Sequence, residues 1–332
     1  MVYNFLGSIE RGTARSSWFQ WRVGTLQGRW LNLLVLVVCL GLMVACRTHD
    51  QVQAAPVVRL SDLQPLPEEP PGDIIPLRVA VAAVISPKGN VESYTPLLEY
   101  LSRRLGRPVT MVQRRTYAEV NDLIREGEVD LAFVCTSAYV AGEREFGMQL
   151  LAAPQVNGEA AYHAYLIVPA DSPAQTMADL RDKVFAFTDP MSHTGHNYPT
   201  WLVRRLGEEP ETFFARTFFT YSHDDAIRAV AEGLADGASV DSLVYDFALT
   251  RDPSLARRVK IIHRSMPFGA PPVVVGPEVR PQLRAELTDL ILGLEQSEEG
   301  RAILRALGVD RFVPVDDGAY DGVRQIEQDL GR

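Results

Sequence analysis

Short apolar runs alternate with longer amphipathic stretches from residue 77 to residue 330, and this alternation constrains the fold more than any other feature. In the stretch 94–105, for example, Leu97, Leu98, Leu101 and Leu105 recur at helical spacing. The predicted strands are 77–85, 108–112, 130–134, 162–168, 184–187, 217–220, 238–241, 259–263 and 272–275. The predicted helices are 94–105, 117–126, 196–206, 224–232, 280–296, 298–307 and 320–330. Strands separated by helices predict an α/β fold with largely parallel sheets.

The N-terminal residues 1–45 have the pattern of a secretory signal peptide. Four arginines precede an apolar run of fifteen residues, 31–45, which is shorter than the roughly 20 residues of a membrane-spanning helix. The run ends in Leu42-Met43-Val44-Ala45-Cys46, which resembles a bacterial lipobox and predicts a lipid on Cys46. An uncleaved membrane anchor is the alternative, and it would leave the protein in the same place.

Residues 46–74 are predicted to form a tether. The segment 63–72 holds four prolines and has no helical or strand period, as expected of an extended, solvated spacer. Of the three cysteines, Cys39 lies in the predicted signal and Cys46 would be acylated. Cys135 is then left without a disulfide partner, and its apolar surroundings predict a buried structural thiol.

The net charge argues against a nucleic-acid partner. It is −9 for the 332 residues, and losing residues 1–45, with four arginines and one glutamate, would take it to −12. Binding to a polyanion relies on clustered lysine and arginine, so we expect no nucleic-acid surface. A small anion held by helix N-termini and hydroxyl groups is not excluded, because that attraction is local.

Three strand-to-helix junctions are rich in small polar residues, and such junctions carry the ligands of open α/β sheets. In the first, 188–196, Ser192 and Thr194 are good N-cap residues and Gly195 lets the backbone pass close to a ligand. Free N–H groups and the helix dipole favour an anion there. An ordinary capped helix explains the same residues.

The second and third junctions each offer one titratable side chain. His223, in 220–225, would donate to an oxyanion or simply cap the following helix. Asp241 ends a predicted strand and would cap a helix or accept a hydrogen bond from a ligand that still carries a proton. Phosphate and phosphonates present such a proton near neutral pH and sulfate does not, so the second role would be selective.

These junctions, with several other runs, resemble the phosphate/phosphite/phosphonate substrate-binding proteins of ABC transporters. The similar runs are 94–109, 116–117, 130–133, 137–139, 188–195, 222–224, 240–241 and 267–272. The resemblance implies a type II periplasmic-binding-protein fold, in which two α/β lobes are joined by two crossover strands around a ligand cleft. The lobes would comprise 75–165 with 266–332, and 166–265.

The resemblance also implies roles for particular residues. Ser192, Thr194 and Gly195 would hold the oxyanion, His223 would donate to it, and Asp241 would take its proton. A tyrosine of the first lobe would complete the site, and Tyr94, Tyr117 and Tyr139 are all candidates. His193 and His196 are atypical at their positions. Their i, i+3 spacing is compatible with a metal, but nothing else supplies ligands, so we expect neither metal nor cofactor.

The predicted function is capture without chemistry. A lipid-anchored, monomeric protein outside the cytoplasm would bind a phosphonate, phosphite or phosphate by lobe closure and deliver it to a membrane permease. One alternative is a ligand sensor that signals to a membrane histidine kinase, which would use the same closure. A second is an enzyme related to the pyrimidine-precursor synthases, which share the architecture but would need no secretion signal.

Overall fold

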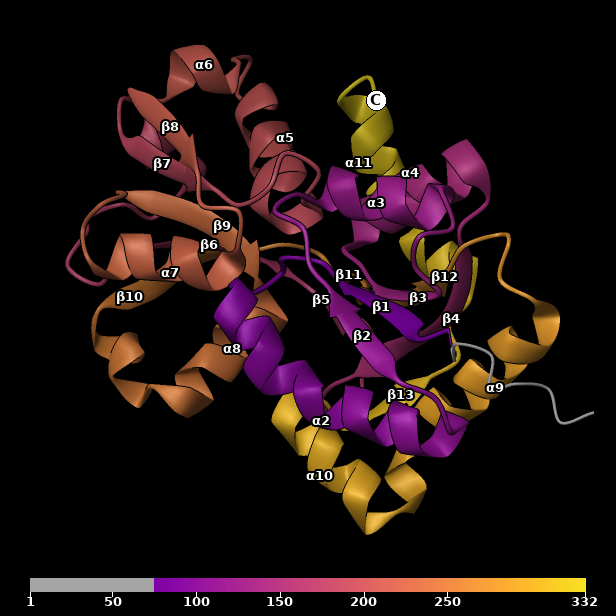
Figure 1. Ribbon diagram of the computed structural model, residues 1–332. Coiled ribbons are helices and arrows are strands. Elements are labelled where there is room, and N and C mark those ends of the chain that lie inside the picture. Colours follow the sequence, from indigo (N-terminus) through magenta and orange to yellow (C-terminus); the bar gives the residue numbers. More distant parts are fainter. Residues whose placement is uncertain (1–74) are drawn as a thin grey trace, which may run out of the picture. The chain divides into compact units, whose positions relative to one another are not determined.

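The computed structural model describes residues 75–332, and Figure 1 shows how their elements are arranged. The predicted signal peptide, tether and lipidated Cys46 lie outside the described residues. Among the helices of this described part, none is both long and apolar enough to cross a membrane.

The first sheet has six strands in the order β13-β4-β12-β3-β1-β2. Their bounds are β1 Leu77–Val81, β2 Val109–Val112, β3 Leu131–Phe133, β4 Gln149–Gln155, β12 Val273–Val275 and β13 Arg311–Val313. β1 runs parallel to β2 and β3, whereas β12 is antiparallel to β3 and β4, and β13 is antiparallel to β4.

The second sheet has five strands in the order β10-β6-β9-β7-β8. Their bounds are β6 Ala164–Pro169, β7 Val184–Phe187, β8 Arg216–Phe219, β9 Gly237–Asp241 and β10 Val259–Arg264. β7 is parallel to β8 and β9, and β6 is antiparallel to β9 and β10. The expectation of largely parallel sheets is therefore wrong. Four strands of each sheet run in one direction, β1–β4 in the first and β7–β10 in the second. β12 and β13, and β6, run the other way, so most neighbouring strands pair antiparallel.

Helices and single turns connect and cover the strands. The α-helices are α2 Pro87–Leu105, α3 Tyr117–Arg125, α4 Thr136–Phe146, α5 Tyr198–Arg204, α6 Pro210–Phe213, α7 His223–Ala231, α8 Ser242–Arg251, α9 Pro281–Leu292, α10 Glu298–Leu307 and α11 Asp321–Asp329. The shorter turns are η2 Met177–Leu180, η3 His193–Asn197, η4 Pro253–Arg257, η5 Leu294–Gln296 and η6 Asp317–Tyr320.

Strand alternation divides each sheet into two packed faces. Leu77, Val79 and Val81 of β1 pack with α2, α9 and α10, while Ala80 packs with α3, α4 and α11 on the other face. The second sheet follows the same rule, with Ile167 facing α7 and α8. Its other face packs against α5 and α6. Both sheets are thus buried between helices, as the apolar strand runs predict.

Two short strands lie where the chain passes between the sheets. β5 (Ala161–Tyr162) precedes β6, β11 (Phe268–Gly269) follows β10, and the two pair antiparallel with each other. The chain crosses between the sheets at these two places. The ends of the strands of both sheets are thereby held close together.

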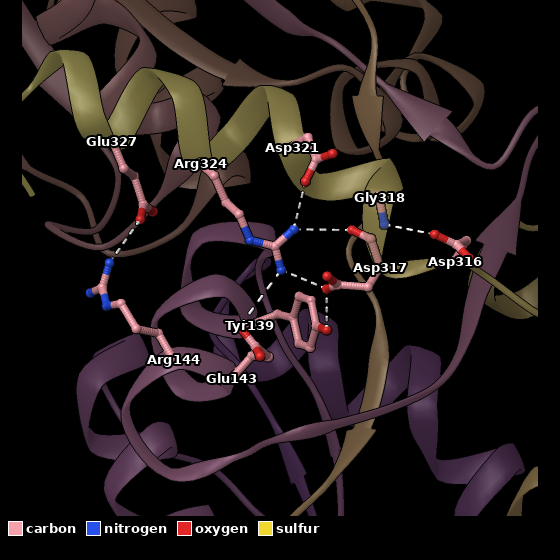
Figure 2. A network of polar contacts seen from close by, with 9 residues as sticks. All are labelled: Tyr139, Glu143, Arg144, Asp316, Asp317, Gly318, Asp321, Arg324 and Glu327. Carbon is pink, nitrogen blue, oxygen red and sulfur yellow. Dashed lines mark hydrogen bonds and ion pairs between the residues drawn. The ribbon is translucent and has the colours of Figure 1, made fainter.

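The last helix is tied to α4 by a polar network. The Arg324 guanidinium contacts the carboxylates of Asp317, Asp321 and Glu143, and the Tyr139 hydroxyl donates to Asp317 Oδ1 at 2.7 Å (Figure 2). Arg144 and Glu327 add a second contact between the two helices at 3.8 Å. These contacts fix which way the Tyr139 side chain points.

Candidate ligand-binding site

The structure brings the three polar junctions together. Ser192 Oγ lies 3.5 Å from His223 Nε2, and the Asp241 backbone N–H donates to His223 Nδ1 at 3.0 Å. Ser192, His223 and Asp241 are each at most 2% exposed. Residues up to 49 positions apart in the sequence therefore form one buried cluster at the ends of β7 and β9.

The Ser192 turn is wound as a π-helix over η3. The Ser192 carbonyl accepts from the N–H groups of both His196 and Asn197, and Ser192 Oγ accepts from Gly195 N–H at 3.1 Å. A Cβ at Gly195 would stand 1.8 Å from Thr188 Oγ1, so close packing of the turn on the end of β7 requires glycine. This contact is a reason for glycine in addition to the predicted approach to a ligand, which stays a prediction.

The His223 ring is held as a neutral donor. Because Nδ1 accepts the Asp241 N–H, the single proton of the neutral imidazole is assigned to Nε2, the atom nearest Ser192. Burial lowers the pKa of His223 to about 3, which keeps the ring neutral at pH 7. An N–H donor is therefore available beside the Ser192 hydroxyl.

Asp241 caps α8 and also faces the cluster. Its Oδ1 accepts from the N–H groups of Leu243 at 2.7 Å and Val244 at 3.4 Å. Burial raises the pKa of Asp241 to about 7, although the two backbone hydrogen bonds act in the opposite direction. A carboxyl with this pKa readily shares a proton near neutral pH.

Residues of α3, α4 and β5 complete the cluster. Tyr117, at the start of α3, has no exposed surface. Burial raises the pKa of Tyr117 well above its usual range, and the charges of Cys135, Asp189 and Asp241 add to this effect. The Tyr162 hydroxyl lies 2.5 Å from Thr136 Oγ1, and burial, followed by the charges of Cys135 and Asp241, raises its pKa above the usual range.

Several buried polar atoms around this cluster lack a hydrogen-bond partner among the described residues. They are Tyr117 OH, Thr188 Oγ1, Thr194 Oγ1, Ser222 Oγ and both ring nitrogens of His193. Buried polar atoms are normally paired, because an unpaired one costs about 1–3 kcal/mol. Hydroxyl groups are both donors and acceptors, so this set fits a ligand with several acceptor oxygens.

Hydrogen bonds around the cluster join elements that pack on the first sheet to elements that pack on the second. His223 N–H donates to the Val84 carbonyl at 2.9 Å, and Tyr117 N–H donates to Asp189 Oδ2 at 3.1 Å. Ser86 N–H donates to Asp224 Oδ1 at 2.8 Å. The cluster is therefore enclosed by both halves of the fold.

The other predicted tyrosines lie elsewhere. Tyr139 turns its hydroxyl to Asp317, on the side of α11 (Figure 2). Tyr94 packs edge-on against Phe133 with ring centroids 4.9 Å apart, and it lines a cavity next to Asp241. Of the three candidates, Tyr117 is the one that reaches the polar cluster.

The two atypical histidines lie beside aromatic rings, His193 buried and His196 half-buried. His193 lies edge-on to Phe268 with centroids 4.2 Å apart, and His196 lies 4.9 Å from the Phe187 ring. Burial lowers the pKa of His193 to about 3 and that of His196 to about 4. No group of three His, Cys, Asp or Glu residues suited to a metal was found within 75–332.

Sequence reasoning missed two residues of the cluster. Thr188 directly follows β7, just as Asp241 ends β9, so the rule that ligands bind at strand ends would have found it. Tyr162 lies inside a predicted strand, where nothing local distinguishes it from a core residue. Cys135 is a buried free thiol as predicted, and burial raises its pKa to about 11.

The arrangement matches a known family. Residues 79–320 match the model of the ABC transporter, phosphonate, periplasmic substrate-binding protein family. The chain belongs to this family. It is thus a transporter substrate-binding protein and not an enzyme, which excludes the synthase alternative.

Individual relatives agree with the family match. The phosphate-import protein PhnD of Mycolicibacterium smegmatis is 30% identical over 285 residues, which are 78% of this chain and 88% of that protein. A binding protein of an ABC phosphonate transporter from Pseudomonas aeruginosa has a TM-score of 0.72 at 22% identity, covering 77% of this chain and 86% of its own. PhnD1 of Prochlorococcus marinus, solved with methylphosphonate, has a TM-score of 0.69 at 18% identity. The match covers 77% of this chain and 98% of that protein.

These likenesses establish the fold. The substrate-binding protein has the type II periplasmic-binding-protein fold, with two α/β lobes joined by two crossover strands. The polar cluster lies between the two sheets, and elements that pack on both of them contribute residues to it.

Proposed function

We propose that the protein captures a phosphonate, phosphite or phosphate in the polar cluster. Ser192, Thr194 and Tyr117 hydroxyls and the His223 Nε2–H would donate to the oxyanion, with Gly195 holding the turn in place. The observation that carries this proposal is the set of buried, unpartnered hydroxyl groups beside the Asp241 carboxyl group. An anion with several acceptor oxygens would satisfy all of them at once.

Asp241 would select for a protonated anion. Its Oδ1 is occupied by two backbone N–H groups, which leaves the other oxygen free to accept an O–H from the ligand. Phosphate and phosphonates carry such a proton near pH 7, whereas sulfate would meet an unpaired carboxylate. Selectivity would thus come from hydrogen-bond geometry and not from net charge.

Capture would proceed by lobe closure, with 75–165 and 266–332 as one lobe and 166–265 as the other. Ser192 and Thr194 have no exposed surface, so a ligand reaches them only when the lobes separate. The hydrogen bonds from Ser86 and Tyr117 to Asp224 and Asp189 would form on closure. The closed protein would then deliver its ligand to the permease of the transporter.

Calorimetric titration of phosphate and methylphosphonate tests the site. Ser192→Ala and His223→Ala should each weaken binding of both ligands at least about 10-fold, since each removes a buried charge-assisted hydrogen bond. Ser254→Ala, on the partly exposed η4 turn, serves as the control and should leave both affinities unchanged. If Ser192→Ala and His223→Ala bind as the unmodified protein does, the site is elsewhere.

Asp241→Asn tests the selectivity. The variant should gain affinity for sulfate relative to phosphate, because the repulsive carboxylate is gone while the side chain keeps its shape. Unchanged discrimination in the same titrations would show that Asp241 does not accept the ligand's proton.

The remaining parts of the proposal concern anchoring and assembly. Cys46 would carry a lipid that holds a monomer at the outer face of a membrane. In cells grown with a radiolabelled fatty acid, the unmodified protein should incorporate the label and Cys46→Ala should not; an unlabelled unmodified protein would contradict the lipid anchor. Light scattering after size-exclusion chromatography of the Cys46→Ala protein should give the mass of one chain, and a larger mass would contradict the monomer.

A further inference from the structure

A cavity of about 130 Å³ adjoins the polar cluster. Both lobes form its wall, with Val81 and Phe133 at the ends of β1 and β3 and with Val244 and Phe247 on α8. Pro154 and Phe312 line it as well, and the Phe312 ring packs edge-on against Phe133. Most of the surface that it presents is therefore hydrocarbon.

Two residues join this cavity to the cluster. Asp241 lines the cavity and is also part of the cluster, where its backbone bonds to His223. Val84 lines the cavity as well, and its carbonyl accepts the His223 N–H. A ligand whose oxyanion contacts His223 and Asp241 would therefore have its remaining substituent next to the cavity.

We infer that this cavity holds the carbon substituent of an organophosphonate, and that the protein prefers substituents that are uncharged and mainly hydrocarbon. The inference rests on the proposed function, because it requires the phosphorus oxyanion to occupy the polar cluster. It goes further by naming the class of substrate. Inorganic phosphate and phosphite would leave the cavity unfilled.

The volume sets the size of the substituent. An apolar protein cavity of about 150 Å³ is large enough to bind benzene. A cavity of about 130 Å³ accordingly fits a four-carbon chain or a phenyl ring. Each buried methylene group adds roughly 0.8 kcal/mol to binding, so a longer chain binds more tightly until the space is filled.

The polar groups of the wall disfavour a cationic substituent. Asp241 is the one carboxylate among the residues that line the cavity, and its oxygens face α8 and the oxyanion. Asn90 Oδ1 is a buried acceptor without a partner, and Ser93 lies on the same helix. These neutral groups match a hydroxyl group on the substituent, but they do not offset the desolvation of an ammonium group.

The ligand series for calorimetry is phosphate, methylphosphonate, n-butylphosphonate, phenylphosphonate and 2-aminoethylphosphonate. We expect n-butylphosphonate and phenylphosphonate to bind at least about 10-fold more tightly than methylphosphonate, and 2-aminoethylphosphonate to bind more weakly than methylphosphonate. If methylphosphonate binds and the larger ligands bind no more tightly, the inference is wrong and the proposed function stands. Tightest binding of 2-aminoethylphosphonate also overturns it. If no phosphorus ligand binds, the proposed function itself fails.

Two variants that fill the cavity test its location. Ser93→Leu on α2 and Val309→Phe beside Phe312 should each reduce the ratio of n-butylphosphonate to methylphosphonate affinity to near one. Thr95→Leu, at an exposed position of the same α2 helix, is the matched control and should keep the ratio of the unmodified protein. Because the two variants lie on different elements, one remains informative if the other does not fold. An unchanged ratio in a folded cavity variant would contradict the inference.

Discussion

Two buried tyrosines differ in one respect that decides their roles. The Tyr117 hydroxyl has no partner within the described residues, whereas the Tyr139 hydroxyl donates to Asp317 at 2.7 Å. An unpaired buried hydroxyl lowers the stability of the unliganded protein, and a ligand that accepts its hydrogen bond removes this cost. A paired hydroxyl stabilises the fold whether or not a ligand is bound.

Tyr117→Phe should therefore change the affinity for ligand, whereas Tyr139→Phe should change the stability of the fold. Tyr117→Phe should weaken binding of methylphosphonate about 10-fold without lowering the free energy of unfolding of the unliganded protein. Tyr139→Phe should keep the affinity and lower that free energy by about 1–2 kcal/mol, because it breaks the bond to a charged acceptor. Calorimetry and urea unfolding of both variants measure the two quantities. A loss of affinity in Tyr139→Phe alone would reverse the assignment.

The raised pKa of Asp241 makes the stability of the unliganded protein depend on pH. This carboxyl has a pKa of about 7 in the folded protein against about 4 in the unfolded chain, so the folded state binds the extra proton between these values. The contribution is favourable below about pH 4 and is lost as the pH rises through about 7. The physical cause is burial of the charged form.

Asp241→Asn should remove this dependence. The free energy of unfolding of the variant, minus that of the unmodified protein, should increase by roughly 3 kcal/mol between pH 4 and pH 8. Urea unfolding across this range, without phosphate, measures it. The histidines with lowered pKa values act in the opposite direction, but they occur in both proteins and cancel in the difference. A difference independent of pH would contradict the raised pKa.

Whether the role of a single residue can be predicted from sequence depends on how near along the chain its contacts lie. Ser192, His223 and Asp241 were predicted because a strand end followed by a helix start is a pattern within ten residues. The choice among Tyr94, Tyr117 and Tyr139 was not available from sequence. It depends on partners far along the chain, such as Asp317, which lies 178 positions from Tyr139.

At the level of elements, the turn after β7 depends on one glycine. A Cβ at Gly195 would overlap Thr188 Oγ1, and Thr188 N–H donates to the Gly195 carbonyl at 3.2 Å. The two segments therefore touch without room for a side chain. Since Ser192 and Thr194 belong to the same turn, any shift would move both proposed ligand contacts.

Gly195→Ala should consequently abolish phosphate binding and lower the free energy of unfolding by at least about 2 kcal/mol. Gly158→Ala is the control, because a Cβ there meets nothing within 4 Å although φ is +83°. Its expected cost is about 1 kcal/mol from the left-handed backbone, with no change in affinity. Thermal unfolding and calorimetry compare the two. Equal affinities in both variants would show that the turn tolerates a side chain.

The elements themselves were predicted where their pattern was strong. The strand 184–187 and the helix 298–307 agree with β7 and α10, and α2 begins earlier than predicted, at Pro87. Helices α4 and α8 and strands β4 and β13 were not predicted. In α4 the residues from Thr136 to Gly142 are all buried, so small and polar residues lie where a helical pattern would show large apolar ones. The order of β12 and β4 in the first sheet is set by long-range pairing that sequence periodicity does not encode.

For the molecule as a whole, the proposed lobe closure would make affinity depend on how readily the lobes close. The Ser86 N–H to Asp224 bond joins the lobes without belonging to the proposed ligand contacts. It would exist in the closed form and be absent from the open one. Removing it should lower the population of the closed, binding-competent form, and the apparent affinity falls by the same factor.

Asp224→Ala should weaken phosphate binding about 5-fold, since a hydrogen bond of this kind contributes about 1 kcal/mol to the closed form. Asp225→Ala is a closely matched control. It removes a carboxylate from the same first turn of α7, with the same loss of interaction with the helix dipole, but Asp225 pairs with Arg228 on its own helix. Small-angle scattering should show a larger radius of gyration for Asp224→Ala than for Asp225→Ala at a subsaturating phosphate concentration. Equal affinities and radii in the two variants would mean that the bond between Ser86 and Asp224 does not govern closure.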